Sequence, residues 1–201
     1  MTTIAIISSG MGEPSTSHML ADRYAQAIEQ AMPDASVERI TLRELARDIT
    51  DAAMAGFASP RLQHVIDQVT SADALVVVSP IYNGSYAGLF KLFVDVFEEN
   101  AFTGKPVLLA ATGGTARHSL AIEHAMRPLF AYLQALALPT GVFASPHDWS
   151  SEGVGALTER VTRAVDELAS ILSGSGTGRG PDDEFDLTSP TFLAASRPKG
   201  T

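Results

Sequence analysis

Two short, unbroken apolar runs constrain the fold of this chain more than any other feature of its sequence. Residues 75–78 (LVVV) and 107–111 (VLLAA) each have the pattern of a strand without polar alternation. Such strands are typical of a parallel sheet that is covered on both faces. Pro80 follows the first run, and because proline has no backbone N–H we expect the chain to leave the sheet there.

The rest of the chain alternates between strand and helix patterns. Further strands are expected at residues 2–7, 35–40 and 139–144, helices at 16–32, 42–49, 61–69, 86–97, 118–135 and 152–172, and a loop at 51–60. Five strands alternating with helices predict an α/β fold, a five-stranded parallel sheet with helices on both faces. Short, right-handed crossovers favour the flavodoxin-like strand order 2-1-3-4-5.

Two helical segments carry additional information. Pro128 lies inside the segment 118–135 and cannot donate to the carbonyl of His124, so we expect a kink or a π-bulge there. Residues 88–97 are apolar nearly all round, which favours burial against a second subunit. The alternative interpretation of His124 is an ordinary surface histidine.

Length and composition indicate one domain and a tail. The 201 residues are 45% hydrophobic, and we assign residues 1–172 to one domain. Residues 173–201 are rich in Gly, Ser, Pro and acids and are expected to form a flexible tail. The alternative is that Phe185, Leu187, Phe192 and Leu193 dock on a neighbouring subunit. Without a membrane-spanning run or a signal peptide at the start, we expect a cytoplasmic protein with no membrane partner.

Cysteine content and charge exclude several classes of function. The sequence has no cysteine, which rules out disulfides, thiolate metal sites and cysteine nucleophiles. We predict no metal site, and any redox chemistry must belong to a bound cofactor. The net charge of −9 argues against a nucleic-acid partner, because nucleic-acid binding depends on clustered Lys and Arg.

The first loop, residues 8–17 (SSGMGEPSTS), has the composition of an anion site. It lacks the Gly-Lys-Ser/Thr of a Walker loop, and Ser15 stands where a dinucleotide fingerprint has its third glycine. Five hydroxyls remain, together with free amides at a helix N-terminus, where the helix dipole favours an anion. These features suit a phosphate monoester such as that of FMN. The simpler alternative is a helix cap, which needs only one hydroxyl.

Three strand-end loops are expected to meet at one edge of the sheet: residues 9–17, 80–85 and 112–115. Together they are predicted to hold the phosphate, the ribityl chain and the ring of a flavin. No catalytic side chain is predicted, because hydride transfer from a nicotinamide to a flavin is cofactor chemistry that the protein orients. The alternative for residues 80–85 is a plain turn with Ser85 as a helix N-cap, since Asn-Gly is a common turn sequence.

Several motifs resemble those of the NAD(P)H-dependent FMN reductases. They are Pro14–Ser15, PIYNGS at 80–85, Lys91, TGGTARH at 112–118 and AIEHAMRP at 121–128. More narrowly, the chain is similar to the subgroup that supplies reduced FMN to luciferase-like monooxygenases in two-component systems. The similarity extends over about residues 1–150. One departure is the segment Ser9 to Gly12, where relatives in the sulfonate-linked branch carry Gly-Ser-Pro followed by Arg.

The resemblance implies a function and a set of site residues. It implies NADPH, or NADH, as hydride donor, FMN as cofactor and substrate, and a homodimer or homotetramer with a helix bulge near His124 at a subunit interface. The phosphate would be held by Ser9, Met11, Ser15, Thr16 and Ser17. The ring would be surrounded by Pro80, Ile81, Tyr82, Asn83, Gly84, Ser85, Thr112, Gly113 and Gly114.

Other functions remain open from the sequence. One is a reductase of quinones, azo dyes or metal oxyanions that retains its FMN. Another is a flavodoxin-type electron carrier, which is less favoured because flavodoxins are usually smaller and more acidic, with aromatic residues on both faces of the ring. Here only Tyr82 and Tyr86 stand near the ring loops. A non-redox module that binds a phosphorylated ligand is the last alternative.

Overall fold

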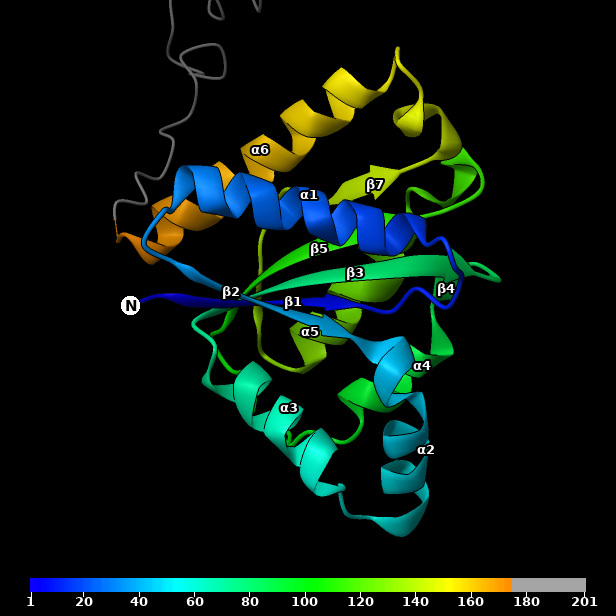
Figure 1. The fold of residues 1–201 in the computed structure, drawn as a ribbon, viewed down its shortest axis with the longest axis vertical. Helices are drawn as coiled ribbons and strands as arrows, with labels where there is room; N and C mark the ends of the chain where they lie inside the picture. Colours follow the sequence, from blue (N-terminus) through cyan, green and yellow to red (C-terminus); the bar gives the residue numbers. More distant parts are fainter. Residues whose placement is uncertain (175–201) are drawn as a thin grey trace, which may run out of the picture.

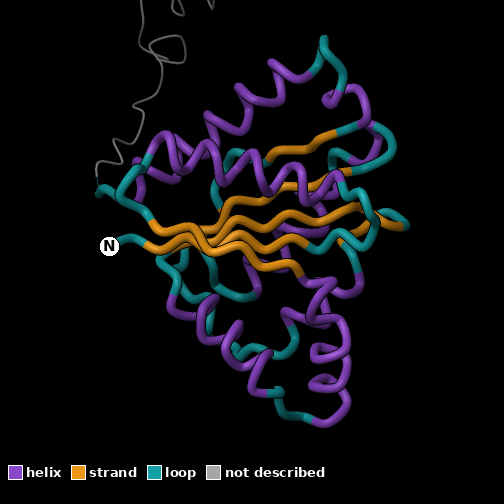
Figure 2. The backbone as a smooth tube through the Cα atoms, in the orientation of Figure 1, coloured by secondary structure: helices purple, strands orange, loops and turns teal. Residues whose placement is uncertain are grey.

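The computed structural model describes residues 1–174, which form a three-layer α/β sandwich (Figure 1). The strands are β1 (Thr3–Ser8), β2 (Ser36–Thr41), β3 (Ala74–Tyr82), β4 (Ser85–Tyr86), β5 (Pro106–Thr112), β6 (Leu136–Ala137) and β7 (Val142–Ala144). The α-helices are α1 (Thr16–Ala31), α2 (Ala46–Ala55), α3 (Pro60–Ser71), α4 (Gly88–Val94), α5 (Arg127–Tyr132) and α6 (Val154–Leu172). Helices α1 and α6 cover one face of the sheet, and the other helices cover the opposite face (Figures 1 and 2).

The sheet confirms the parallel α/β class but not the simple five-stranded order. Its order is β2-β1-β3-β5-β6, with β7 also beside β5 and β4 paired only with β3. Two features account for the difference. The two-residue strand β4 returns antiparallel to β3. Of the last expected strand, 139–144, only Val142–Ala144 forms a strand, β7, opposite Ala110 to Thr112. A separate two-residue strand, β6, precedes it and lies opposite Pro106 and Val107.

Arg127 provides a physical reason for the interruption between β6 and β7. Its guanidinium donates to the backbone carbonyls of Ala137, Leu138 and Pro139 at 3.3, 2.8 and 3.1 Å. Pro139 itself has no N–H to offer a neighbouring strand. The segment after β6 is therefore held by a side chain instead of by a continuous ladder.

The expectation that the chain leaves the sheet at Pro80 is wrong, because β3 continues to Tyr82. The Val78 carbonyl accepts from the N–H of Ser9, so Val78 faces β1. Alternate residues of a strand direct their backbone groups to the same side, which places the Pro80 nitrogen on that side as well. Strand β1 ends at Ser8, so no ladder bond is lost when proline occupies this position.

The central strands supply both halves of the core. Ile4, Ile6, Val76 and Val78 pack with α1 and α6, and the alternate residues pack with the helices on the other face. All residues from Leu75 to Val78 have no exposed surface. This confirms the sequence interpretation that unbroken apolar runs form strands covered on both faces.

The helical expectations hold in part. Residues 42–49 form a 3₁₀ turn, η1 (Leu42–Leu45), and then the start of α2. Helix α2 continues to Ala55, so the first half of the loop expected at 51–60 is helical. The single helix expected at 118–135 is three pieces: η2 (Ala116–His118), a π-helix η3 (Ile122–Met126) and α5. The predicted bulge is therefore confirmed. It places Pro128 in the first turn of α5, where a missing N–H costs little.

Two further expectations concern membrane-spanning segments and the C-terminal tail. Among residues 1–174, no helix combines the length and apolarity needed to cross a bilayer. The predicted tail from Ser173 onward lies, after Gly174, outside the described residues.

Candidate functional site

A cleft of about 510 Å³ opens where the strands β3, β5 and β7 end, as expected for the ligand site of an open parallel sheet. It is lined by Thr16, Met19, Pro80, Ile81, Tyr82, Thr112, Gly113, Gly114, Ala144, Pro146 and Trp149. A second cleft of about 590 Å³ lies elsewhere, beside Phe57, Ile66 and Phe97. No strand end contributes to that cleft, so the first one is the candidate site.

The first loop lies against the ends of β3 and β5. Ser9 is fully buried, its N–H donates to the Val78 carbonyl at 3.0 Å, and its hydroxyl makes a longer contact of 3.4 Å with the same oxygen. The Ser17 hydroxyl shares a hydrogen bond of 2.8 Å with that of Thr112. This buried pair joins the start of α1 to the end of β5.

The hydroxyls at the start of α1 still have capacity for an anion. Ser15 caps α1 by accepting from the N–H of His18 at 3.3 Å, which leaves its own hydroxyl hydrogen free to donate. Thr16 lines the cleft with an exposed side chain. The first turn of α1 contains no acidic residue. The helix-cap interpretation is confirmed for Ser15, and because further donors remain at the helix start, the anion site stays a prediction.

Gly10 allows the first loop to fold tightly. A Cβ at this position would lie 2.1 Å from the Ser15 Oγ and 3.1 Å from the Ser17 Cβ. The absence of a side chain lets Ser15 turn inward over the loop to reach the helix. Met11, by contrast, is exposed and does not line the cleft.

Residues 80–85 form a β-hairpin at the end of β3. Asn83 and Gly84 both have positive φ, 51° and 83°, as a two-residue type I′ turn requires. Tyr82 lies opposite Ser85 in the hairpin and is 48% exposed at the cleft. Asn83, Gly84 and Ser85 do not line the cleft, and the N-cap of α4 is Ala87, not Ser85.

A buried serine that the sequence did not single out supports this hairpin. The Ser79 hydroxyl accepts from the N–H of Ala87 and donates to the Pro80 carbonyl, each at 3.0 Å. It therefore joins the start of the hairpin to the start of α4.

The loop after β5 places two glycines at the cleft. The Gly113 N–H donates to the Ala144 carbonyl at 3.1 Å, so this amide already has a partner. A Cβ on Gly113 would lie 2.9 Å from the Phe143 ring. Gly114 is exposed, and within the described part of the chain no atom beyond its chain neighbours lies within 4 Å of its would-be Cβ, so its backbone is accessible to a ligand.

Besides the three loops that the sequence predicted, a fourth segment lines the cleft, and the sequence interpretation missed it. Met19, Ala144, Pro146 and Trp149 line the cleft, the last two from the 3₁₀ helix η4 (Pro146–Trp149). The available signal was Trp149, the only tryptophan of the chain, in a loop after an expected strand. It also weakens the sequence argument against an electron carrier, which rested on the aromatic residues near the ring loops.

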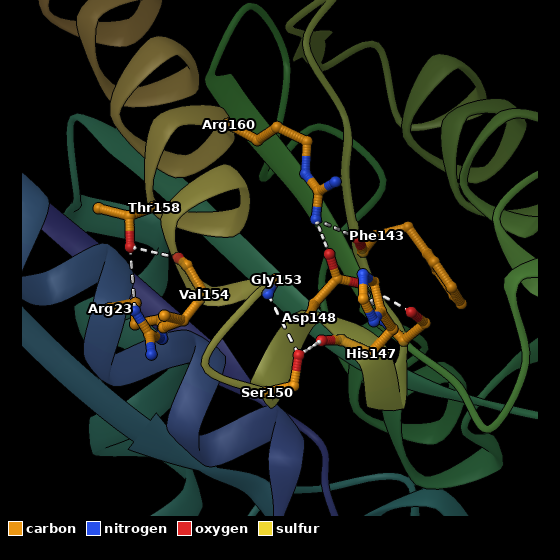
Figure 3. A network of polar contacts seen from close by, with 10 residues as sticks. Arg23, Phe143, His147, Asp148, Ser150, Gly153, Val154, Thr158 and Arg160 are labelled. Carbon is orange, nitrogen blue, oxygen red and sulfur yellow. Dashed lines mark hydrogen bonds and ion pairs between the residues drawn. The ribbon is translucent and has the colours of Figure 1, made fainter.

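Asp148 fixes the position of η4. Its carboxylate accepts from the N–H and the hydroxyl of Ser145, both at 2.7 Å, and pairs with the Arg160 guanidinium (Figure 3). Burial alone would raise the pKa of Asp148, but the hydrogen bonds from Ser145 and Arg160 outweigh it and hold the pKa below its usual value.

The lining of the cleft suits a flat ligand with one anionic group. Among residues 1–174, those that line it include no acid, lysine, arginine or histidine. Apolar and aromatic groups can cover a planar ring, while hydroxyls and amides at the start of α1 can accept a phosphate. The buried Ser9 and Ser17 and the tight turn at Gly10 fit the phosphate end of FMN. The fold defines a flavodoxin-like α/β protein, and the cleft at its strand ends is the candidate nucleotide site.

Comparison with known proteins identifies the family. Residues 2–150 match the family of NADPH-dependent FMN reductases. The chain is 38% identical over 174 residues to "FMN reductase (NADPH)" from Pseudomonas aeruginosa, a match covering 85% of this chain and 92% of the relative. It is 34% identical over 171 residues to "NADH-dependent FMN reductase SfnF" from Pseudomonas putida, covering 84% and 92%.

A solved structure of a related oxidoreductase has the same fold. An oxidoreductase from Corynebacterium diphtheriae superposes with a TM-score of 0.83 at 38% identity, covering 87% of this chain and 98% of that one. The chain therefore belongs to the NADPH-dependent FMN reductase family. It is an oxidoreductase that acts with FMN and NAD(P)H.

Proposed function

We propose that this protein transfers hydride from NADPH to FMN bound in the strand-end cleft and passes the reduced FMN to a luciferase-like two-component monooxygenase. The observation that carries the proposal is the uncharged lining of the cleft. A phosphate held by hydroxyls and amides, without a cationic side chain lining the cleft, is bound more weakly than one paired with Arg or Lys. Weak binding suits a flavin that must leave after each turnover.

The first loop would hold the phosphate. Ser15 and Thr16 have hydroxyl hydrogens available at the start of α1, and the backbone amides around Met11 directly precede this helix in the sequence. Ser9 and Ser17 are buried and already paired, so we assign their side chains the task of holding the loop in shape. The backbone N–H of Ser17, in the first turn of α1, would donate to the anion.

The loops after β3 and β5 would hold the ring. Pro80, Ile81 and Tyr82 line one part of the cleft, and Thr112 to Gly114 another. We place Asn83, Gly84 and Ser85 in this group through the hairpin that carries Tyr82. When bound, FMN supplies the atom that accepts the hydride, so the residues themselves need only orient the ring and exclude water.

We also propose a homodimer or homotetramer. Leu92 on α4, Leu120 before the π-helix, and Tyr132 at the end of α5 are large apolar side chains exposed in the single chain. Leu120 and Tyr132 flank in sequence the segment that contains His124, where the sequence resemblance implies a subunit interface. Burying such side chains in a second copy removes apolar surface from water.

Steady-state oxidation of NADPH and NADH, with and without added FMN, tests the proposal. We expect turnover that requires free FMN and prefers NADPH. Adding a luciferase-like monooxygenase with its substrate should then yield oxygenated product from the reduced flavin. Desalted protein that turns over a quinone without added flavin would instead favour a reductase that retains its FMN.

A further inference from the structure

Trp149 occupies a position that neither the sequence motifs nor the family match assigns. It is half-buried, packs against the α1–α6 half of the core and lines the strand-end cleft. Tyr82 is the other aromatic residue that lines the cleft. The two belong to different loops, one on the β3–β4 hairpin and the other on η4, so the cleft has aromatic groups on two separate walls.

The indole of Trp149 is held in place by Arg23 of α1. The guanidinium carbon of Arg23 lies 5.5 Å from the centre of the Trp149 ring, within the range of a cation–π contact. Arg23 lies one turn after Met19 on α1, and Met19 also lines the cleft. The same face of α1 therefore carries both Met19, which lines the cleft, and Arg23, which contacts the indole.

Arg23 is itself anchored to α6. It donates to the Thr158 hydroxyl at 3.1 Å, and Thr158 donates to the Val154 carbonyl at 2.9 Å (Figure 3). The guanidinium therefore has one partner on α6 and one on η4. An indole fixed in this way loses little side-chain entropy when a ligand binds.

We infer that Trp149 is a flavin-positioning residue of the cleft and that Arg23 pre-organises it for FMN. This inference rests on the proposed function. An electron-rich indole that stacks on the electron-poor flavin ring attracts it. The part of the ring that the indole covers is also removed from water. Because Trp149 makes no bond to the phosphate region, it contributes to affinity independently of the first loop.

The test measures the dissociation constant of FMN by equilibrium dialysis in Trp149→Leu, Trp149→Phe and Arg23→Met. We expect Trp149→Leu to weaken FMN binding about 10-fold, as for loss of one stacking partner, and Trp149→Phe to retain most of the affinity. Arg23→Met should weaken binding about 3- to 10-fold, because the indole must then be ordered on binding. Arg163→Met, an equal charge change on an exposed part of α6, is the matched control and should bind as wild type.

A second readout reports contact directly. An indole touching a flavin quenches the flavin's own fluorescence by electron transfer, which acts only at short range. Bound FMN should therefore be brighter in Trp149→Leu than in wild type, and unchanged in Arg163→Met. This signal and the fold of each variant, checked by circular dichroism, separate a contact from a loss of structure.

The outcomes distinguish the inference from the proposed function. Wild-type affinity and wild-type bound-flavin brightness in Trp149→Leu would overturn the inference and leave the proposed function standing. Equal weakening by Arg23→Met and Arg163→Met would overturn the role of Arg23, since net charge alone would then explain it. A wild-type protein that binds no FMN in dialysis would overturn both.

Discussion

Replacing Gly10 by alanine tests the geometry of the first loop. The new Cβ would lie 2.1 Å from the Ser15 Oγ, so the Ser15 side chain must rotate away from the loop. Rotation breaks its hydrogen bond to the His18 N–H, the N-cap of α1, which costs about 1 kcal/mol. The Ser17 Cβ at 3.1 Å also remains too close, so the loop must shift slightly, at a further cost of about 1 kcal/mol.

A smaller effect opposes these costs. Alanine restricts the unfolded chain more than glycine, which returns about 0.5 kcal/mol. We therefore expect Gly10→Ala to lower the free energy of unfolding by about 1.5 kcal/mol. In a Ser15→Ala background the cap is already absent and the Oγ no longer obstructs the Cβ. There the same substitution should cost only about 0.5 kcal/mol, a coupling of about 1 kcal/mol between the two positions.

Urea unfolding of wild type, both single variants and the double variant measures this coupling. Gly155→Ala is the control, because no atom of the described residues lies close to its would-be Cβ and it stands within α6, where alanine is favoured. If the losses of stability in the two single variants sum to the loss in the double variant within about 0.3 kcal/mol, the close approach of Gly10 and Ser15 is refuted. By the same reasoning, Gly10→Ala should weaken FMN binding and the control should not.

Three further predictions follow from other parts of the structure. Arg127→Met removes the donor that holds three backbone carbonyls after β6, and thermal unfolding should show a loss of about 2–3 kcal/mol, whereas Arg163→Met should show almost none. Asp148→Asn should be less stable than wild type at pH 7. Because the folded pKa of Asp148 is depressed, that difference should shrink as the pH falls below about 4 and through the folded pKa; a pH-independent difference would contradict the pairing with Arg160. Lys105→Met removes the contacts of its ammonium with the carbonyls of Thr70 and Ala72 at the end of α3, so hydrogen exchange in the last turn of α3 should accelerate; unchanged exchange would exclude this anchoring role.

Local pattern predicted the buried strands and the bulge, but not where strands end. The runs at 75–78 and 107–111 contain no polar residue, so their burial follows from composition alone. Proline at 128 removes one known hydrogen bond, which makes a bulge a local prediction. The extension of β3 past Pro80 depends on where β1 ends, a fact about a distant segment that proline itself does not reveal.

The candidate site shows the same division. The hydroxyls of the first loop and the glycines after β5 were identifiable because they follow strands directly. The wall formed by Trp149 was not, because its place at the cleft depends on Asp148 of η4 pairing with Arg160 of α6. Similarly, the break between β6 and β7 depends on Arg127, whose reach to distant carbonyls has no signal in the sequence.

The most direct test of the central claim is to locate bound FMN by amide chemical shifts in the isotope-labelled protein. We predict that the largest shifts on titration with FMN lie in residues 9–17, 80–85, 112–114 and 144–149, the four segments around the strand-end cleft. Shifts concentrated instead around Phe57, Ile66 and Phe97, in the other large cleft, would contradict the account.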